Sequence, residues 1–217
     1  MTNTLPVLYE IKINPFRNEV GITKSDSGQV RFNLNELVVA QINKEIFIGQ
    51  ISKIMDASQP VSDIKCQIIR QANDSDLSRK NSLQKKVGEF KTFFEELLRR
   101  FKLTAKVVLI DCDCNQHKVY CYITSEKKIN YLLLHETAVD SLKTRVAIKQ
   151  IGIRDHARSI GGLGICGREL CCRNFLQNLQ SVTLTMARQQ NLYVEPEKIS
   201  GCCGKLRCCI GFEICNR

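Results

Sequence analysis

The sequence lacks the features that mark membrane and exported proteins. No apolar run approaches the roughly 18 residues that a membrane-spanning helix requires. The first ten residues, MTNTLPVLYE, contain neither the basic start nor the long apolar stretch of a secretory signal. These absences argue against a membrane span and against a secreted disulfide scaffold, and we expect a cytoplasmic protein.

Signatures of the common enzyme classes are scarce as well. The chain has only three histidines, and no sequence pattern orients His156 or either of the others toward a cysteine, as Cys–His catalysis requires. The glycines of residues 161–164 do not form a phosphate-binding or dinucleotide-binding motif. We therefore predict that the protein is not an enzyme.

Positive charge, by contrast, is abundant. The 217 residues include 32 lysines and arginines but only 22 aspartates and glutamates, which gives a net charge of +10. Residues 79–106 alone hold nine cations against three glutamates. The excess indicates either an anionic partner, such as RNA or an acidic protein, or a solvated basic face. The candidate basic surface consists of Lys85, Lys86, Arg99 and Arg100.

Residues 1–72 have the pattern of a small β unit. Apolar and polar residues alternate in five short runs, separated by turn residues such as Asn14–Pro15. The expected strands are Val7–Ile13, Val30–Leu34, Leu37–Ile42, Ile46–Ile54 and Cys66–Ile69. Short strands joined by tight turns suggest a small barrel or a strongly curved sheet.

Residues 73–152 predict an α+β unit. Apolar residues recur on one helical face over 76–102, where Ser75 or Asp76 can cap the helix. After it we expect strands at 106–111, 118–124 and 145–151 and a helix at 130–143. The order α-β-β-α-β places helices on one face of a small sheet. The chain is thus predicted to be α+β, with a third, cysteine-rich unit over 153–217 packed on the second.

Cysteine is the other residue in excess, and it is unevenly distributed. Eight of the twelve cysteines lie in the last 52 residues, where even spacing would place about three. They are Cys166, Cys171, Cys172, Cys202, Cys203, Cys208, Cys209 and Cys215. In a chain without an export signal, clustered thiols point to metal or redox chemistry rather than to disulfides.

Six of these cysteines form an internal repeat. Residues 166–172 read CGRELCC (copy 1) and residues 203–209 read CGKLRCC (copy 2), 37 residues apart. Glycine after the first cysteine permits a positive φ, which lets the chain fold back so that sulfurs approach one another. Arg168 and Lys205 could offset the negative charge of a thiolate–metal centre. We expect the copies to be two halves of one site. An iron–sulfur cluster, structural zinc, and reactive or buried thiols all fit the spacing.

Longer segments around the repeat resemble the PSP1 superfamily and, within it, the bacterial YaaT/RicT-like proteins. They read RDHARSIGGLGICGRELCCRNFL (154–176), VTLTMARQQNL (182–192), PEKISG (196–201) and CGKLRCCIGFE (203–213). The resemblance implies a [4Fe–4S] cluster and carries the ligand role onto Cys166, Cys171, Cys172, Cys203, Cys208 and Cys209. Cys202 and Cys215 are further thiols that could act as extra ligands.

The resemblance also implies a role. Members of the YaaT/RicT-like group are non-enzymatic regulatory subunits that assemble with small helical proteins of the YlbF/RicF and YmcA/RicA types. They act with the endoribonuclease RNase Y in mRNA processing and in developmental regulation such as sporulation. The alternative is a zinc-stabilised nucleic-acid-binding protein that contacts phosphates through its basic helix and its β unit.

Overall fold

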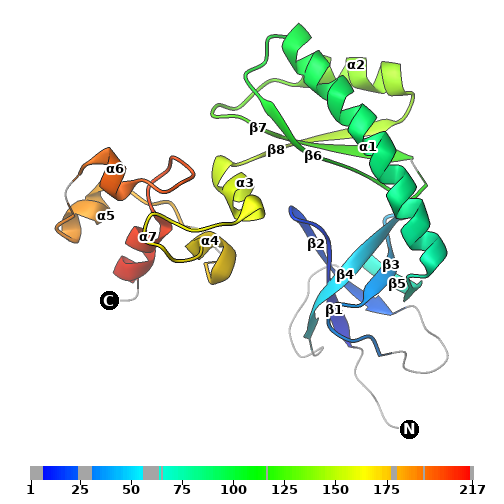
Figure 1. Cartoon of the computed structure of the whole chain (residues 1–217), viewed down its shortest axis with the longest axis horizontal. Helices are drawn as coiled ribbons and strands as arrows, with labels where there is room; N and C mark the ends of the chain where they lie inside the picture. The colour runs from blue at the N-terminus through cyan, green and yellow to red at the C-terminus, as the bar shows by residue number, and fades with distance from the viewer. Residues whose placement is uncertain are drawn as a thin grey trace. The chain divides into compact units, whose positions relative to one another are not determined.

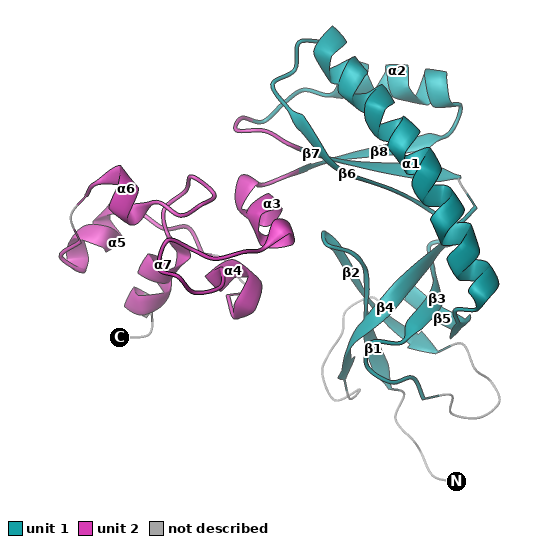
Figure 2. Cartoon of the chain, in the orientation of Figure 1, with its two compact units in different colours: residues 1–123, 128–150 teal, residues 124–127, 151–217 magenta. Residues whose placement is uncertain are grey.

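The computed structural model describes residues 7–23, 31–55, 64, 66–115, 117–176, 180–192 and 194–215. The chain divides into two compact units (Figure 2). The first unit comprises residues 1–123 and 128–150, and the second comprises residues 124–127 and 151–217. None of the helices in the described ranges combines the length and apolar character needed to cross a membrane.

The first unit begins with a closed five-stranded barrel (Figure 1). Its strands are β1 (Leu8–Asn14), β2 (Arg17–Thr23), β3 (Leu37–Ile42), β4 (Glu45–Met55) and β5 (Cys66–Gln71). They pair in the order β1-β2-β5-β3-β4, and the parallel pairing of β2 with β5 closes the ring. The buried faces of the strands fill the barrel with Ile11, Val38, Ile51 and Ile68. A side chain at Gly49 would collide with Ile11, so this crossing of β1 and β4 needs glycine.

One of the five predicted strands is wrong. The described residues 31–34 form no strand, and residue 30 lies outside the described part. Phe32 instead packs edge-on against Tyr9, with ring centroids 5.8 Å apart, and its backbone N–H donates to the Tyr9 hydroxyl. The second strand is β2, which the alternation rule missed because its sequence, RNEVGIT, is polar and interrupted by glycine.

The rest of the first unit is the predicted α-β-β-α-β arrangement, which confirms the α+β class. Its elements are α1 (Asp74–Arg100), β6 (Lys106–Cys112), β7 (Lys118–Thr124), α2 (Leu132–Leu142) and β8 (Arg145–Ile151). The strands form one sheet in the order β6-β7-β8. The long helix starts two residues earlier than expected. Asn73 is its N-cap, and the Asn73 backbone N–H donates to the Asp76 carboxylate at 2.9 Å.

Alternate residues of β7 separate two buried layers. Val119, Cys121 and Ile123 join Phe94 of α1 and Leu134 of α2 in the main hydrophobic core. Burial raises the pKa of the Cys121 thiol to about 12, so this cysteine stays a protonated core residue at neutral pH.

The opposite face of β7 meets the barrel through polar contacts. Glu45 of β4 accepts hydrogen bonds from the Tyr120 hydroxyl and from the Lys118 ammonium group, the latter at 3.0 Å. The Asn14 amide donates to the Asp111 carboxylate at 2.6 Å. Side-chain hydrogen bonds therefore join the barrel to the sheet within the first unit.

The second unit is built from short helices. They are α3 (Ile153–Ile160), α4 (Cys171–Asn174), α5 (Leu184–Gln189), α6 (Pro196–Ile199) and α7 (Cys208–Cys215). Among the described residues, Ala187, Ile199 and Ile210 form a small apolar cluster with three half-buried neighbours, and Leu170 and Cys172 are buried as well. Units of this size often need a disulfide or a metal in addition to so small a core.

Candidate metal centre

The two cysteine copies fold into the same local structure. In copy 1 the Gly164 N–H donates to the Arg168 carbonyl at 2.8 Å, and in copy 2 the Gly201 N–H donates to the Lys205 carbonyl at 2.8 Å. Each bond closes a tight loop with the first cysteine of its copy inside. The two hydrogen bonds are therefore also 37 residues apart, so the sequence repeat is a structural repeat.

Glycine conformation turns the chain at matching points of the two loops. Gly167 and Gly204 have φ angles of 73° and 71°, in the left-handed region that favours glycine. The predicted positive φ after each first cysteine is therefore confirmed. Beyond the loops, α4 begins at Cys171 and α7 begins at Cys208, so each cysteine pair opens a helix.

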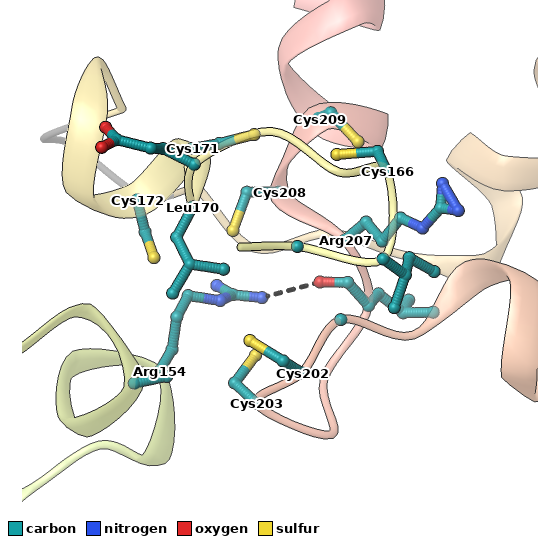
Figure 3. Close-up of a pocket in the computed structure, with 16 residues that line it drawn as sticks. Arg154, Cys166, Leu170, Cys171, Cys172, Cys202, Cys203, Arg207, Cys208 and Cys209 are labelled. Atoms are coloured by element: carbon teal, nitrogen blue, oxygen red, sulfur yellow. Dashed lines mark hydrogen bonds between the residues drawn. The ribbon is translucent and has the colours of Figure 1, made fainter. Parts of the chain in front are cut away.

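Both copies border a single pocket of about 70 Å³, which we call the thiol pocket (Figure 3). Seven cysteines line it: Cys166, Cys171, Cys172, Cys202, Cys203, Cys208 and Cys209. Cys215 is the last residue of α7, and its side chain lies outside the described part. The described side chains nowhere form a group of three or more that is already arranged to hold a metal ion. The copies share one pocket, but the sulfurs do not converge on one point.

The thiols differ in their surroundings. Cys166 and Cys202 are exposed, whereas Cys172 is buried. Burial raises the pKa of the Cys172, Cys208 and Cys209 thiols. A metal that binds these sulfurs must therefore displace protons from them.

The cations that border the pocket are not the predicted ones. Arg154 of α3 and Arg207 line it, and Arg154 Nη2 donates to the Leu206 carbonyl at 3.1 Å (Figure 3). The side chains of Arg168 and Lys205 are exposed and are not among the lining residues. Long cationic side chains in a tight loop stay hydrated, whereas a cation on a neighbouring helix can reach inward. Arg154 was not predicted from the sequence because it lies outside both copies of the repeat.

The basic surface lies on α1, in the first unit. Its four residues are all exposed. The other face of the helix is buried in the main core through Leu83, Phe94, Leu97 and Leu98. The structure thus leaves the basic surface exposed to solvent.

Comparisons with known proteins place the chain in a family. The PSP1 C-terminal conserved region matches residues 66–151, and the third domain of PSP1-like proteins matches residues 181–215. The stage 0 sporulation protein YaaT of Bacillus subtilis (strain 168) is 30% identical over 196 residues, which cover 85% of this chain and 70% of YaaT. The chain belongs to the PSP1 family. No solved structure matches it.

The PSP1 regions map onto the fold in a simple way. The C-terminal conserved region spans β5, α1 and the three-stranded sheet, which carry the basic surface. The third domain spans α5 to α7 and includes copy 2 of the repeat. Copy 1 lies between the two matched regions, so the thiol pocket of this PSP1 protein is assembled from copies inside and outside them.

The donor set of the thiol pocket is suited to an all-thiolate centre. Cysteine sulfurs outnumber every other donor type on its lining, and no histidine is among the lining residues described. Four thiolates are the ligands of [4Fe–4S] clusters and also of one class of structural zinc site. The Nε of Arg154 is buried without a hydrogen-bond partner among the described residues, as expected if it faces an anionic group. The donor types on the lining therefore suit either centre, although the described sulfurs are not gathered into a group that could hold a metal.

Proposed function

We propose that this PSP1 protein is a non-enzymatic regulatory subunit of the cytoplasm that binds a [4Fe–4S] cluster through its repeated cysteines. Its relative YaaT is named as a stage 0 sporulation protein, which supports a regulatory role. The proposed partners are small helical proteins of the YlbF/RicF and YmcA/RicA types. With them the protein acts on RNase Y, and thereby on mRNA processing.

One observation carries this proposal. Two copies of the same cysteine loop, 37 residues apart, border one pocket. Chance would not place two matching loops around a common space, and neither loop contributes a histidine or a carboxylate pair that would serve hydrolysis. Six cysteines in register are the candidate ligands: Cys166, Cys171, Cys172, Cys203, Cys208 and Cys209.

The chain's own residues prepare the site for a bound centre. Gly167 and Gly204 hold the loops in left-handed turns, so that the first cysteine of each copy sits beside the pocket. Leu170 and Leu206 line the pocket with apolar surface, which limits access of water to the sulfurs. When bound, an iron–sulfur cluster would link the two copies and respond to oxygen or to reducing conditions.

The weak core of the second unit supports a bound centre. The few buried apolar residues described in it, such as Ile199, Ile210 and Leu170, form a small core, and the described free cysteines form no disulfide. Metal binding to a site that exists only in the folded state adds directly to the folding free energy. The second unit is therefore expected to depend on its centre for stability.

The alternative is a zinc-stabilised nucleic-acid-binding protein. The exposed basic surface of α1 favours it, because accessible cations on one helix face can contact successive phosphates. RNA binding by the purified protein alone, with steep salt dependence and bound zinc, would establish this function in place of the first.

The test of cluster binding compares three serine variants purified without oxygen. Cys171→Ser and Cys208→Ser each remove one thiol at matching positions of the two copies. Cys114→Ser is the control, because Cys114 is half-buried in the first unit and belongs to neither copy. Iron and sulfide contents should fall in the first two variants and stay at the wild-type level in the control. Equal iron in all four proteins would contradict the ligand assignment.

A further inference from the structure

One face of α3 is directed at the thiol pocket. Arg154 and Ala157 line the pocket, and Arg158 is one helical turn beyond Arg154 on the same face. The two cations of this short helix therefore lie one turn apart, and Arg154 is the one that reaches the lining shared by copy 1 and copy 2.

Arg154, like Arg207 on the same pocket, leaves one of its buried donors without a partner among the described residues. Its Nη2 donates to the Leu206 carbonyl of copy 2 at 3.1 Å, and its side chain reaches from α3 into the pocket (Figure 3). Its Nε is buried and has no hydrogen-bond partner among the described residues. A buried donor of this kind is costly unless an acceptor occupies the space before it. A thiolate or a cluster sulfide is such an acceptor.

The same helix is fastened to copy 1 from its other end. Arg173 of α4 donates from Nη1 to the Ile160 carbonyl, the last residue of α3, at 3.1 Å. Gly161 makes this possible, because it has a φ of 80° and a side chain there would overlap the Arg173 guanidinium. One arginine therefore ties α3 to copy 2 and another ties copy 1 to α3.

We infer that Arg154 is a positioning residue that holds copy 2 against α3 and balances the negative charge of the thiolate-bound centre, with Arg158 adding positive charge one helical turn away. This inference rests on the proposed cluster site. Four thiolates around a cluster leave it with net negative charge, and a desolvated anion requires a nearby cation or donor. Arginine beside the sulfurs stabilises the more negative, reduced form and so raises the reduction potential.

The test uses variants that each remove one charge. Arg154→Gln removes the α3 charge that lines the pocket, and Arg158→Gln removes the charge one helical turn further along α3. Arg168→Gln and Lys205→Gln are matched controls, because these two side chains are exposed and do not line the pocket. Arg154→Lys restores the charge without the fork of donors.

Each protein is purified without oxygen and read out in three ways: iron and sulfide content, midpoint potential, and rate of cluster loss in air. Arg154→Gln should have a more negative midpoint potential than the wild type and lose its cluster about tenfold faster. Arg158→Gln should shift the potential in the same direction. Both controls should match the wild type, and Arg154→Lys should recover most of the potential but less of the stability to air.

The outcomes separate the two proposals. Suppose the wild type holds its cluster, and Arg154→Gln and both controls have the same midpoint potential and cluster lifetime as the wild type. This result would overturn the role of Arg154 and leave the cluster site standing. A wild-type protein without a thiolate-bound metal would overturn both. If the bound metal is zinc, zinc affinity replaces the potential as the readout, and Arg154→Gln alone should lower it. Should Arg154→Gln misfold, Arg154→Lys and Arg158→Gln still decide the question through the potential.

Discussion

Glu45 offers a sharp test of how the barrel is joined to the PSP1 sheet. The Glu45 side chain is 11% exposed, and its carboxylate accepts hydrogen bonds from the Tyr120 hydroxyl and the Lys118 ammonium group. Glu45→Gln removes the charge and one acceptor, so that one of the two donors loses its partner. Loss of a charge-assisted hydrogen bond costs about 1.5–3 kcal/mol. Because the Lys118 side chain is 28% exposed and can turn to water, we expect about 2 kcal/mol.

The effect should depend on pH. Burial by itself raises the pKa of Glu45, but the hydrogen bonds from Tyr120 and Lys118 outweigh burial and place that pKa below the ordinary value of 4.5. The folded state thus binds the Glu45 proton less tightly than the unfolded state does. The charged carboxylate therefore stabilises the fold above the ordinary value, and this stabilisation is lost as pH falls through the lowered pKa.

The assay is thermal unfolding followed by tyrosine fluorescence. Four of the five tyrosines lie in the first unit and the chain has no tryptophan, so the signal reports mainly on that unit. At neutral pH, Glu45→Gln should lower the melting temperature by about 4–8 °C. Glu89→Gln, an exposed change on α1, is the control and should leave it unchanged. The reasoning would be refuted by a Glu45→Gln protein as stable as the control at neutral pH, or by one equally destabilised at neutral pH and at a pH below the lowered pKa of Glu45.

The remaining predictions concern the basic surface and the cysteine loops. Replacing all four residues of the basic surface with glutamine should leave the melting temperature within a few degrees, because exposed charges contribute little to stability. Affinity for an RNA or acidic protein partner should fall. For single-stranded RNA, the slope of log affinity against log salt concentration should become shallower by about 0.7 for each lost phosphate contact. Unchanged binding across salt would show a merely solvated face. Gly167→Ala and Gly204→Ala should each cost about 1–2 kcal/mol and lower metal content, because both glycines have positive φ. Gly88→Ala, in open space on α1, should instead stabilise by about 0.5–1 kcal/mol. Metal content unchanged in both loop variants would contradict the role given to the turns.

Helices, strands and turns that are determined by nearby residues could be predicted from the sequence. The helical periodicity of 76–102 predicted α1 because one apolar stripe faces one core, and the short run 118–124 after a turn predicted β7. The glycines after the first cysteines were predicted to take positive φ for a steric reason that needs no tertiary context.

Features that depend on distant contacts were not predictable in this way. Strand β2 is held in the barrel by β1 and by the parallel strand β5, so its weak alternation did not matter to the fold. Phe32 lies in a run that alternates like a strand, yet the ring of Tyr9 fixes it in a different conformation. The position of Arg154 beside the thiol pocket depends on how α3 packs against the two copies, which no local pattern specifies. Its signal in the sequence was an arginine in a short segment just ahead of copy 1.

The central claim is that the two cysteine copies bind one iron–sulfur centre. The most direct measurement is the iron, acid-labile sulfide and zinc content of the wild-type protein purified without oxygen, together with its absorption spectrum. We expect a brown protein that contains iron and sulfide in equal amounts, loses its colour in air, and retains little zinc. A colourless protein with about one tightly bound zinc and no sulfide would contradict the account and establish the zinc alternative.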